Sequence, residues 1–441
     1  MKVTLIQPAM GRLSNGKKFK RPFTLEPLSI VTLAGLTPPN VELQFFDDRI
    51  EDIDYDQPTD LVGISVETFT ALRAYQIARH YRMRGIPVVL GGFHPTLLPD
   101  EGLRYADSVV IGQAEDLWTK VLLDANKGKL KKRYSSNAVS QITRTRIDRK
   151  MLKGKKYLPV TLVEFGRGCP YHCEFCDIPI FYKGRHDVRP VDEVVSEIIA
   201  SGRKNVLVVD DNISARPYIL LEFSKAVKPL NIRWASQAGI TLAMHDDVLD
   251  AVAESGCVGF LIGFESIDKR NLKLIDKKTN FTIPYKKAIK KFHDRGIRIY
   301  GSFIVGYDFD TPKIIDRTVE FAIKNKIFIV NFNPLFPIPK TPLYNRMIKE
   351  GRLRNKKWWL DSNFRYGDFP FNVHSMSGDD LTKKCEEVKE TFYSISSIIK
   401  RGVGSKTNFG NPLSALIYIL INLRTRSELR GKAQLYLGMD E

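Results

Sequence analysis

Short apolar runs that alternate with amphipathic stretches constrain the fold of this chain more than any other feature. The alternation occurs over residues 1–135 and again over residues 159–340. Strands that alternate with helices indicate parallel sheets covered by helices. The sequence therefore predicts an α/β fold with two domains, which fits 441 residues at about 100–200 residues per domain.

The first series predicts a doubly wound parallel sheet in residues 1–135. Strands are expected at 3–7, 41–46, 61–66, 88–90 and 108–111, and helices at 28–36 and 71–84. Ligands of such sheets bind beyond the carboxyl ends of the strands. A polar, basic stretch at 136–158 is predicted to be a linker to the next domain.

The second series predicts a partial barrel. Strands are expected at 160–164, 206–210, 234–237, 259–264, 299–305 and 327–333. These six strand–helix units are too few for an eight-stranded barrel, so we predict a partial (β/α)6 barrel in residues 159–340. Its catalytic groups should lie at the carboxyl ends of the strands. Residues 341–441 are predicted to form a mostly helical C-terminal region.

Charge and cysteine content narrow the possible environments. The net charge of +18 suits nucleic acid, an anionic membrane, an acidic substrate or simply a solvated surface. No aromatic-rich RNA-binding signature accompanies the basic clusters. Five cysteines, three of them within eight residues, fit a reducing compartment and a metal site. The amino-terminal segment resembles a strand more than a signal peptide, so we expect a cytoplasmic protein.

Three of the cysteines form a motif that carries chemistry. Cys169, Cys173 and Cys176 have the spacing C-x3-C-x2-C and follow a predicted strand directly. Three thiolates can hold three irons of a cubane cluster and leave the fourth iron open to a cofactor or substrate. Gly166 and Gly168 allow a tight loop whose N–H groups can reach the cluster sulfurs.

Zinc is the main alternative for these three cysteines. A structural zinc site usually takes four ligands from paired Cys or His elements. Cys257 and Cys385 stand alone in the sequence, and His172 lies between two of the cysteines. The sequence therefore favours a 4Fe–4S cluster on Cys169, Cys173 and Cys176.

Phe175 completes the pattern C-x3-C-x-aromatic-C, which resembles the motif of the radical S-adenosylmethionine superfamily. The resemblance implies that the open iron chelates the amine and carboxylate of S-adenosylmethionine. Electron transfer from the cluster then cleaves the sulfonium and gives a 5′-deoxyadenosyl radical, which abstracts hydrogen from an unactivated carbon. It also implies a reducing electron donor such as flavodoxin or ferredoxin.

The resemblance assigns a first group of residues to S-adenosylmethionine. The family places a glycine–glycine–glutamate element after the second strand, where it binds the methionyl amine. This chain has Asp210, Asp211 and Asn212 there, whose side chains could accept hydrogen bonds from the ammonium group. A helix N-cap is the structural alternative for Asp211 or Asn212.

Further cofactor residues are assigned by their places at strand ends. Glu265 ends the fourth strand and resembles the polar residue that contacts ribose or carboxylate. Val305 lies at the end of the fifth strand, where the family packs adenine. Gln237 ends the third strand, and either a cofactor contact or a core hydrogen bond would suit it.

The first domain resembles the cobalamin-binding-like domain found in one branch of the superfamily. The polar turn with Ser65 and Thr68 and the glycine pair Gly91 and Gly92 carry this resemblance and are the candidate cobalamin-binding residues. The D-x-H-x-x-G loop that ligates cobalt in mutases is absent. We therefore expect either cobalamin without a histidine on cobalt or a vestigial domain, with His94 close to the cofactor or structural.

Segments 176–185 and 337–344 resemble the subgroup with hopanoid and bacteriochlorophyll side-chain methylases. The function predicted from this resemblance is cobalamin-dependent radical C-methylation of a large apolar substrate, either a bacteriochlorophyllide-type tetrapyrrole or a polycyclic isoprenoid lipid. Cyclisation or carbon–carbon or carbon–oxygen bond formation on the same substrates is the alternative. RNA modification is disfavoured, because methylthiolating relatives would need a second cysteine trio in the cysteine-free first domain.

The C-terminal region contains one long apolar run. Residues 413–423 are apolar except for Ser414, Tyr418 and Asn422, and several basic residues follow them. Such a run is typical of a docked core helix, and with a basic flank it also suits peripheral contact with a membrane.

Overall fold

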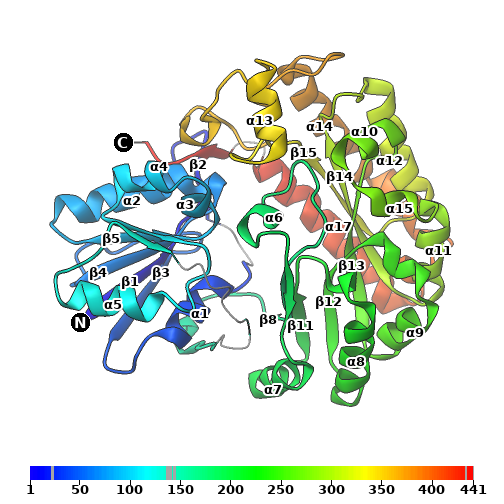
Figure 1. Ribbon diagram of the computed structural model, residues 1–441. Coiled ribbons are helices and arrows are strands. Elements are labelled where there is room, and N and C mark those ends of the chain that lie inside the picture. The colour runs from blue at the N-terminus through cyan, green and yellow to red at the C-terminus, as the bar shows by residue number, and fades with distance from the viewer. Residues whose placement is uncertain (21–23, 136–141, 143–145, 433–434, 441) are drawn as a thin grey trace. The chain divides into compact units, whose positions relative to one another are not determined.

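A computed structural model describes residues 1–441 apart from 21–23, 136–141, 143–145, 433–434 and 441 (Figure 1). Parts of the predicted linker therefore lie outside the described residues. The chain divides into two compact units. The first contains Met1–Pro159, Lys357–Tyr366 and Gln434–Glu441, and the second contains Val160–Lys356 and Gly367–Ala433.

The first unit is built on a parallel six-stranded sheet with the order β3-β1-β4-β5-β6-β7. Its strands are β1 (Lys2–Gln7), β3 (Glu42–Asp47), β4 (Leu61–Ser65), β5 (Val88–Gly91), β6 (Ser108–Ile111) and β7 (Arg133–Ser135). The direction of winding reverses between β1 and β4, so a ligand crevice is expected beyond their carboxyl ends.

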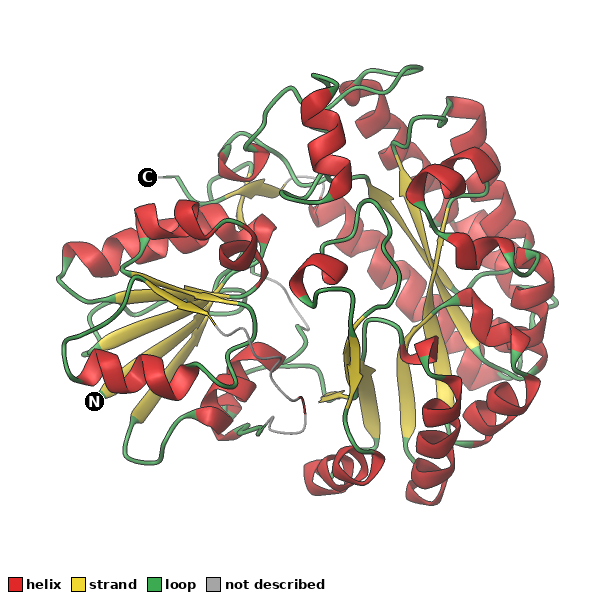
Figure 2. Ribbon diagram, viewed as in Figure 1, coloured by secondary structure: helices red, strands yellow, loops and turns green. Residues whose placement is uncertain are grey.

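Helices cover both faces of this sheet, as Figures 1 and 2 show. They are α1 (Leu28–Leu36) and α5 (Trp118–Asn126) on one face, and α2 (Ala71–Met83), α3 (Phe93–Leu97) and α4 (Pro99–Tyr105) on the other. The buried apolar residues of the strands, such as Val3, Leu5 and Val89, form the core beneath them. The predicted doubly wound parallel sheet is confirmed.

Two short segments from late in the chain complete the first unit. A turn of 3-10 helix at Trp358–Leu360 buries Trp358 and Trp359 almost entirely. The strand β16 (Leu435–Leu437) pairs antiparallel with β2 (Gly11–Leu13). The C-terminal region, which was expected to be mostly helical, therefore also supplies a strand and an aromatic anchor to the first unit.

The second unit contains a parallel six-stranded sheet whose strands lie in chain order, β8-β11-β12-β13-β14-β15. The strands are β8 (Thr161–Glu164), β11 (Asn205–Val209), β12 (Arg233–Ala238), β13 (Cys257–Glu265), β14 (Arg298–Val305) and β15 (Ile329–Pro334). The helices between them include α7 (Val191–Ser201), α8 (Pro217–Val227), α9 (Asp246–Glu254), α10 (Lys269–Ile275), α11 (Tyr285–Asp294) and α12 (Pro312–Lys324). All six predicted strands are present, and their carboxyl ends meet along one edge.

Strand β14 shows how the two faces of this sheet differ. Ile299, Phe303 and Val305 are buried in the core, whereas the alternating Tyr300 and Ser302 are only partly buried. Side chains of a strand point alternately to its two faces, so one face packs against helices and the other stays accessible. The accessible face is the one available for ligands.

The C-terminal helices belong to the second unit. They are α13 (Pro342–Lys349), α14 (Gly378–Phe392), α15 (Ile395–Gly402), α16 (Lys406–Phe409) and α17 (Pro412–Lys432). The buried Arg401 donates hydrogen bonds to the carbonyl oxygens of Ile327, Phe328 and Phe392 and to Asn422, which joins these helices to the sheet. Across the described part of the chain, every helix is too short or too polar to cross a membrane.

Candidate cluster and cofactor site

The cysteine loop begins from a small hairpin at the edge of the second unit's sheet. Strand β9 (Gly166–Gly168) pairs antiparallel with β10 (His186–Val188). Gly168 has a φ of +83°, and a Cβ at this position would lie 2.0 Å from the carbonyl oxygen of Arg185. Only glycine fits here without moving the hairpin. The backbone conformation therefore requires glycine at the position just before Cys169.

The three predicted ligands lie on the loop that follows, and all three are free thiols. Cys173 is buried, and Cys169 and Cys176 are partly exposed. Burial raises the pKa of Cys173 to about 11, while the charge of Lys277 opposes this rise. A metal must therefore displace the protons from these thiols, as metal binding to cysteine generally does. Phe175 packs against the core of the unit and anchors the loop from within.

The loop is held from two further elements. The N–H of Glu174 donates to the carbonyl of Ile275 at 3.0 Å, and the N–H of Leu343 donates to the carbonyl of Glu174 at 3.0 Å. The Glu174 carboxylate pairs with Arg346, which also binds Asp308 at 2.7 Å. Contacts at the end of α10 and in α13 thus orient the segment between Cys173 and Cys176.

The donor set fits an iron–sulfur cluster. In a cubane each thiolate binds a different iron, so the sulfurs need not converge on one point. Among the described residues, no group of three or more His, Cys, Asp or Glu side chains is placed to hold a single metal ion. Three thiols on one loop therefore suit a cluster better than one zinc ion, which gathers its ligands around a single centre.

Tyr307 is a candidate that the sequence did not reveal. Its side chain is fully buried, and its hydroxyl has no hydrogen-bond partner among the described residues. Burial raises the pKa of Tyr307, and the charges of Glu174, Cys173 and Glu265 raise it further. The group therefore stays a neutral donor beside the cysteine loop. An orphaned buried donor is costly unless a ligand satisfies it.

Lys277 is the second candidate missed from the sequence. It forms an ion pair with Glu265, and the side chains are only 18% and 7% exposed. Its charge also acts on Cys169, Cys173 and Cys176. A largely buried cation beside the three cysteines would stabilise the thiolate forms that bind a cluster. It follows α10 in an ordinary lysine-rich stretch, so no sequence pattern distinguishes it.

Glu265 sits at the carboxyl end of β13 in an uncommon backbone conformation. Its φ is +61°, which non-glycine residues rarely adopt. The sheet register also shifts between Gly263 and Glu265. Such conformations persist where surrounding contacts hold them, and they are frequent at functional sites.

The three residues after β11 differ in their partners. Asp210 pairs with His186 at 3.0 Å, and Asn212 accepts hydrogen bonds from Ser214 and from the N–H of Gly239. Asp211 accepts from the N–H of Gly168 at 2.7 Å. Burial raises the pKa of Asp211 to about 6, so its carboxylate is ionised at neutral pH. Asp211 is the member best suited to bind an ammonium group, and Asp210 orients the hairpin.

Gln237 and Val305 lie along the same carboxyl edge. The Gln237 side chain is exposed and donates to the carbonyl of Asp211 at 2.8 Å. Val305 is buried, and its carbonyl accepts from the N–H of Leu335. The second unit thus brings the cysteine loop and all six predicted S-adenosylmethionine residues to one edge of one sheet. Their roles stay predictions.

A cavity of about 440 Å³ lies on the accessible face of this sheet. At one end it reaches Asp210 and Gln237, at the carboxyl ends of their strands. At the other end it reaches Arg298 and Phe328 near the amino ends, and Ile421 of α17. Its lining is mainly apolar, and its size lies in the range of small-molecule sites.

The predicted cobalamin residues share one edge of the first unit's sheet. Ser65 ends β4 and Thr68 follows it, whereas Gly91 ends the neighbouring β5 and Gly92 follows it. Gly92 has a φ of +101°, and a Cβ there would lie 2.8 Å from the carbonyl oxygen of Val66. The glycine pair therefore lets two strand ends approach closely.

His94 is fully buried behind this edge. Its Nδ1 lies 3.3 Å from the hydroxyl of Thr68, and its Nε2 lies 3.1 Å from the carboxylate of Glu101. Glu101 also accepts from Lys357 and from the indole of Trp359, each at 2.8 Å. Both nitrogens of His94 are thus engaged inside the unit, which supports the structural interpretation of this residue.

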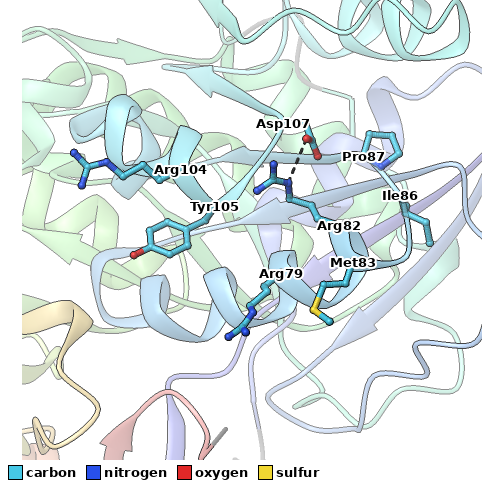
Figure 3. Close-up of a pocket in the computed structure, with 9 residues that line it drawn as sticks. Arg79, Arg82, Met83, Ile86, Pro87, Arg104, Tyr105 and Asp107 are labelled. Carbon is cyan, nitrogen blue, oxygen red and sulfur yellow. Dashed lines mark hydrogen bonds and ion pairs between the residues drawn. The ribbon is translucent and has the colours of Figure 1, made fainter.

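A second pocket in the first unit lies away from these residues. It opens beside Arg79, Arg82, Tyr105 and Asp107 (Figure 3). Its position is at the amino ends of β5 and β6 and the last turn of α2, where basic side chains favourably meet the helix C-terminus. Since ligands of such sheets bind at the carboxyl ends, we assign this pocket no part in the chemistry.

Comparison with known proteins identifies the family. A model of the radical SAM superfamily matches residues 163–322, which include the cysteine loop. The chain is 31% identical over 396 residues to bacteriochlorophyllide d C-12(1)-methyltransferase of Chlorobaculum tepidum, covering 87% of this chain and 86% of the relative. It is 26% identical over 347 residues to hopanoid C-2 methylase of Rhodopseudomonas palustris, covering 75% of this chain and 65% of that protein.

Solved structures share the fold. The methyltransferase TsrM of Kitasatospora setae, with tryptophan and an S-adenosylmethionine analogue bound, has a TM-score of 0.64 at 15% identity and covers 98% of this chain and 99% of its own. The cobalamin-dependent enzyme OxsB, with aqua-cobalamin and S-adenosylmethionine bound, has a TM-score of 0.70 at 14% identity, covering 97% of this chain and 71% of its own.

The cysteine loop lies at the carboxyl edge of a parallel sheet, and the same chain contains a second, doubly wound sheet. This arrangement indicates an iron–sulfur enzyme of the α/β class. The chain belongs to the radical SAM superfamily. The 4Fe–4S cluster and S-adenosylmethionine predicted from the sequence are therefore confirmed at the level of the family.

Proposed function

We propose that this enzyme is a cobalamin-dependent radical C-methyltransferase that acts on an unactivated carbon of a large apolar substrate. The observation that carries the proposal is 31% identity across 86% of the length of a bacteriochlorophyllide d methyltransferase. Similarity over nearly the whole length includes both units and not only the cysteine loop. A tetrapyrrole of the bacteriochlorophyllide type is the preferred substrate, and a polycyclic isoprenoid lipid is the second.

The second unit would bind the cluster and S-adenosylmethionine. Cys169, Cys173 and Cys176 would hold three irons, and Asp211 would bind the methionyl amine. The Lys277–Glu265 pair would contact the carboxylate or the ribose of S-adenosylmethionine. When bound, the cluster supplies the electron that cleaves one molecule of S-adenosylmethionine. Cobalamin, when bound, supplies a methyl group that it takes from a second molecule of S-adenosylmethionine. A reducing protein such as flavodoxin or ferredoxin would provide the electron.

The first unit would bind cobalamin at the carboxyl edge of β4 and β5. Ser65, Thr68, Gly91 and Gly92 would approach the corrin there. The contacts of His94 with Thr68 and Glu101 support binding without a histidine on cobalt. His94 would instead hold Thr68 in place.

Anaerobic reconstitution with substrate tests the reaction. Purified enzyme, a reductant, hydroxocobalamin and S-adenosylmethionine carrying a CD3 group are incubated with an unmethylated bacteriochlorophyllide. We expect equimolar 5′-deoxyadenosine and S-adenosylhomocysteine, and a product that carries the intact CD3 group. The variant Cys173→Ala should give none of the three.

Two other outcomes decide against methylation. If 5′-deoxyadenosine forms without S-adenosylhomocysteine, and the product gains a ring or an oxygen, the alternative bond-forming reaction is correct. If cofactor extraction finds no cobalamin and none binds on reconstitution, the first unit is vestigial and the cobalamin-dependent mechanism is wrong.

A further inference from the structure

Exposed apolar side chains are concentrated in the C-terminal helices of the second unit. Of the eighteen large apolar side chains exposed in the described part of the chain, nine lie between residues 395 and 423. Six are on α17, namely Leu413, Leu416, Ile419, Leu420, Ile421 and Leu423, and their exposed fractions run from 36% to 63%. Three lie on or directly after α15, namely Ile395, Ile399 and Val403, and they are 51–59% exposed. We call these nine residues the apolar face.

The core-helix interpretation of residues 413–423 is therefore wrong. Within α17 only Tyr418 and Asn422 are buried among the described residues. The Tyr418 hydroxyl donates to the carbonyl of Ile398 at 2.9 Å, which joins α17 to α15. These contacts hold α17 by one narrow side, and most of its apolar surface remains uncovered. Apolar surface of this extent usually marks an interaction site.

The charged residues in the segment that carries the apolar face are all basic. No acidic residue occurs between Glu390 and Glu428, whereas four basic residues do besides the buried Arg401. Lys400, Lys406 and Arg424 are exposed. Apolar residues flanked by basic ones fit the interface of an anionic bilayer, where leucines enter the acyl boundary and cations meet the headgroups. A second copy of this chain would bring like charges together, so self-association is disfavoured.

One residue of the apolar face also borders the cavity of the second unit. Ile421 belongs to the apolar face and lines the cavity on the accessible side of the sheet. Ile421 therefore places α17 beside the cavity that reaches Asp210 and Gln237. An apolar substrate held in a lipid surface would reach the cavity from this side of α17.

We propose that the apolar face of α15 and α17 docks the enzyme on the surface of an anionic lipid bilayer. The helices would lie in the interface, because no described helix can span the bilayer. The proposal goes beyond the methyl-transfer reaction and is independent of it, since vesicle binding is measured without turnover. Failure of one proposal therefore leaves the other intact.

Co-sedimentation of the full-length protein with vesicles tests the proposal. The vesicles contain phosphatidylglycerol and phosphatidylcholine, or phosphatidylcholine alone. We expect binding to the anionic vesicles that weakens steeply as salt rises from ~0.1 M to ~0.5 M. The double variant Leu416→Glu/Leu420→Glu should lower the partition coefficient at least about tenfold, because it puts two charges on the apolar face.

The matched control is Ile199→Glu on α7, where an isolated isoleucine is 60% exposed. It adds a charge at a similarly exposed position and should change binding less than about twofold. Because all three residues are exposed, the variants should fold, and circular dichroism verifies this. Absence of vesicle binding by the unaltered protein, or equal binding by the double variant, would overturn the proposal. Light scattering that shows a dimer, with monomers for the double variant, would assign the apolar face to self-association instead.

Discussion

Replacement of Glu101 should cost the first unit considerable stability. Its carboxylate is 6% exposed and accepts hydrogen bonds from Lys357 and Trp359 while lying 3.1 Å from His94. Burial alone would raise the pKa of Glu101, but these three partners outweigh it and lower the pKa from 4.5 to about 2. The ionised carboxylate therefore belongs to the folded state.

The lowered pKa of Glu101 corresponds to a contribution to the free energy of unfolding. A difference of roughly 2.5 pKa units corresponds to about 3 kcal/mol of folding stability at neutral pH. Because the folded-state pKa is depressed, this contribution is present above about pH 4.5 and is lost as pH falls toward about 2. Glu101→Gln keeps the shape but removes the charge, so it should destabilise the unit by about 2–3 kcal/mol at pH 7.

Equilibrium urea unfolding of the full chain, followed by tryptophan fluorescence, measures this loss. Trp118, Trp358 and Trp359 belong to the first unit and only Trp234 to the second, so fluorescence reports mainly on the first unit. Lys357→Met is the control at the other end of the pair. Lys357 is half-exposed, so its loss should cost less than about 1 kcal/mol. A loss below about 0.5 kcal/mol for Glu101→Gln, or a loss confined to the second unit, would refute the reasoning.

Three further predictions concern the second unit. Cys173→Ala should abolish iron binding on anaerobic reconstitution, whereas Cys385→Ala, at a buried thiol that donates to the carbonyl of Phe332, should leave iron content unchanged. Lys277→Gln should lower the midpoint potential of the cluster by an amount on the order of tens of millivolts, because a buried cation favours the reduced form; redox titration followed by electron paramagnetic resonance measures it, and an unchanged potential would remove Lys277 from the site. Burial lowers the pKa of His293 to about 4. Since the unfolded chain then binds more protons, stability should fall by about 1.3 kcal/mol between pH 7.5 and pH 5.5, and His293→Phe should abolish that part of the pH dependence in urea unfolding.

The strands and the cysteine motif could be predicted because their signals are local. Buried parallel strands appear as short apolar runs, and the run at 299–305 corresponds to β14 (Arg298–Val305). Cys169, Cys173 and Cys176 lie within one loop, so their spacing alone indicates shared ligation. Glu265 was predicted for a related reason, since catalytic groups of such sheets gather at strand ends.

The residues missed by sequence reasoning act through contacts between distant parts of the chain. Lys277 meets Glu265 and the cysteine loop only after α10 has packed, and Tyr307 is recognised only because its hydroxyl is buried without a partner. The exposure of α17 could not be predicted either, because an apolar run has the same sequence pattern whether the folded protein buries it or leaves it exposed.

The sequence by itself determined the α/β class and the radical superfamily, and it predicted the cluster ligands. Periodicity and spacing are properties of neighbouring residues, and they survive in the unfolded chain. Only the tertiary structure decided that Glu101 pairs with Lys357, 256 residues away, and that β16 pairs with β2. The physical reason is that burial sets the strength of a charge pair and the fate of an apolar side chain, and burial exists only once distant segments have packed together.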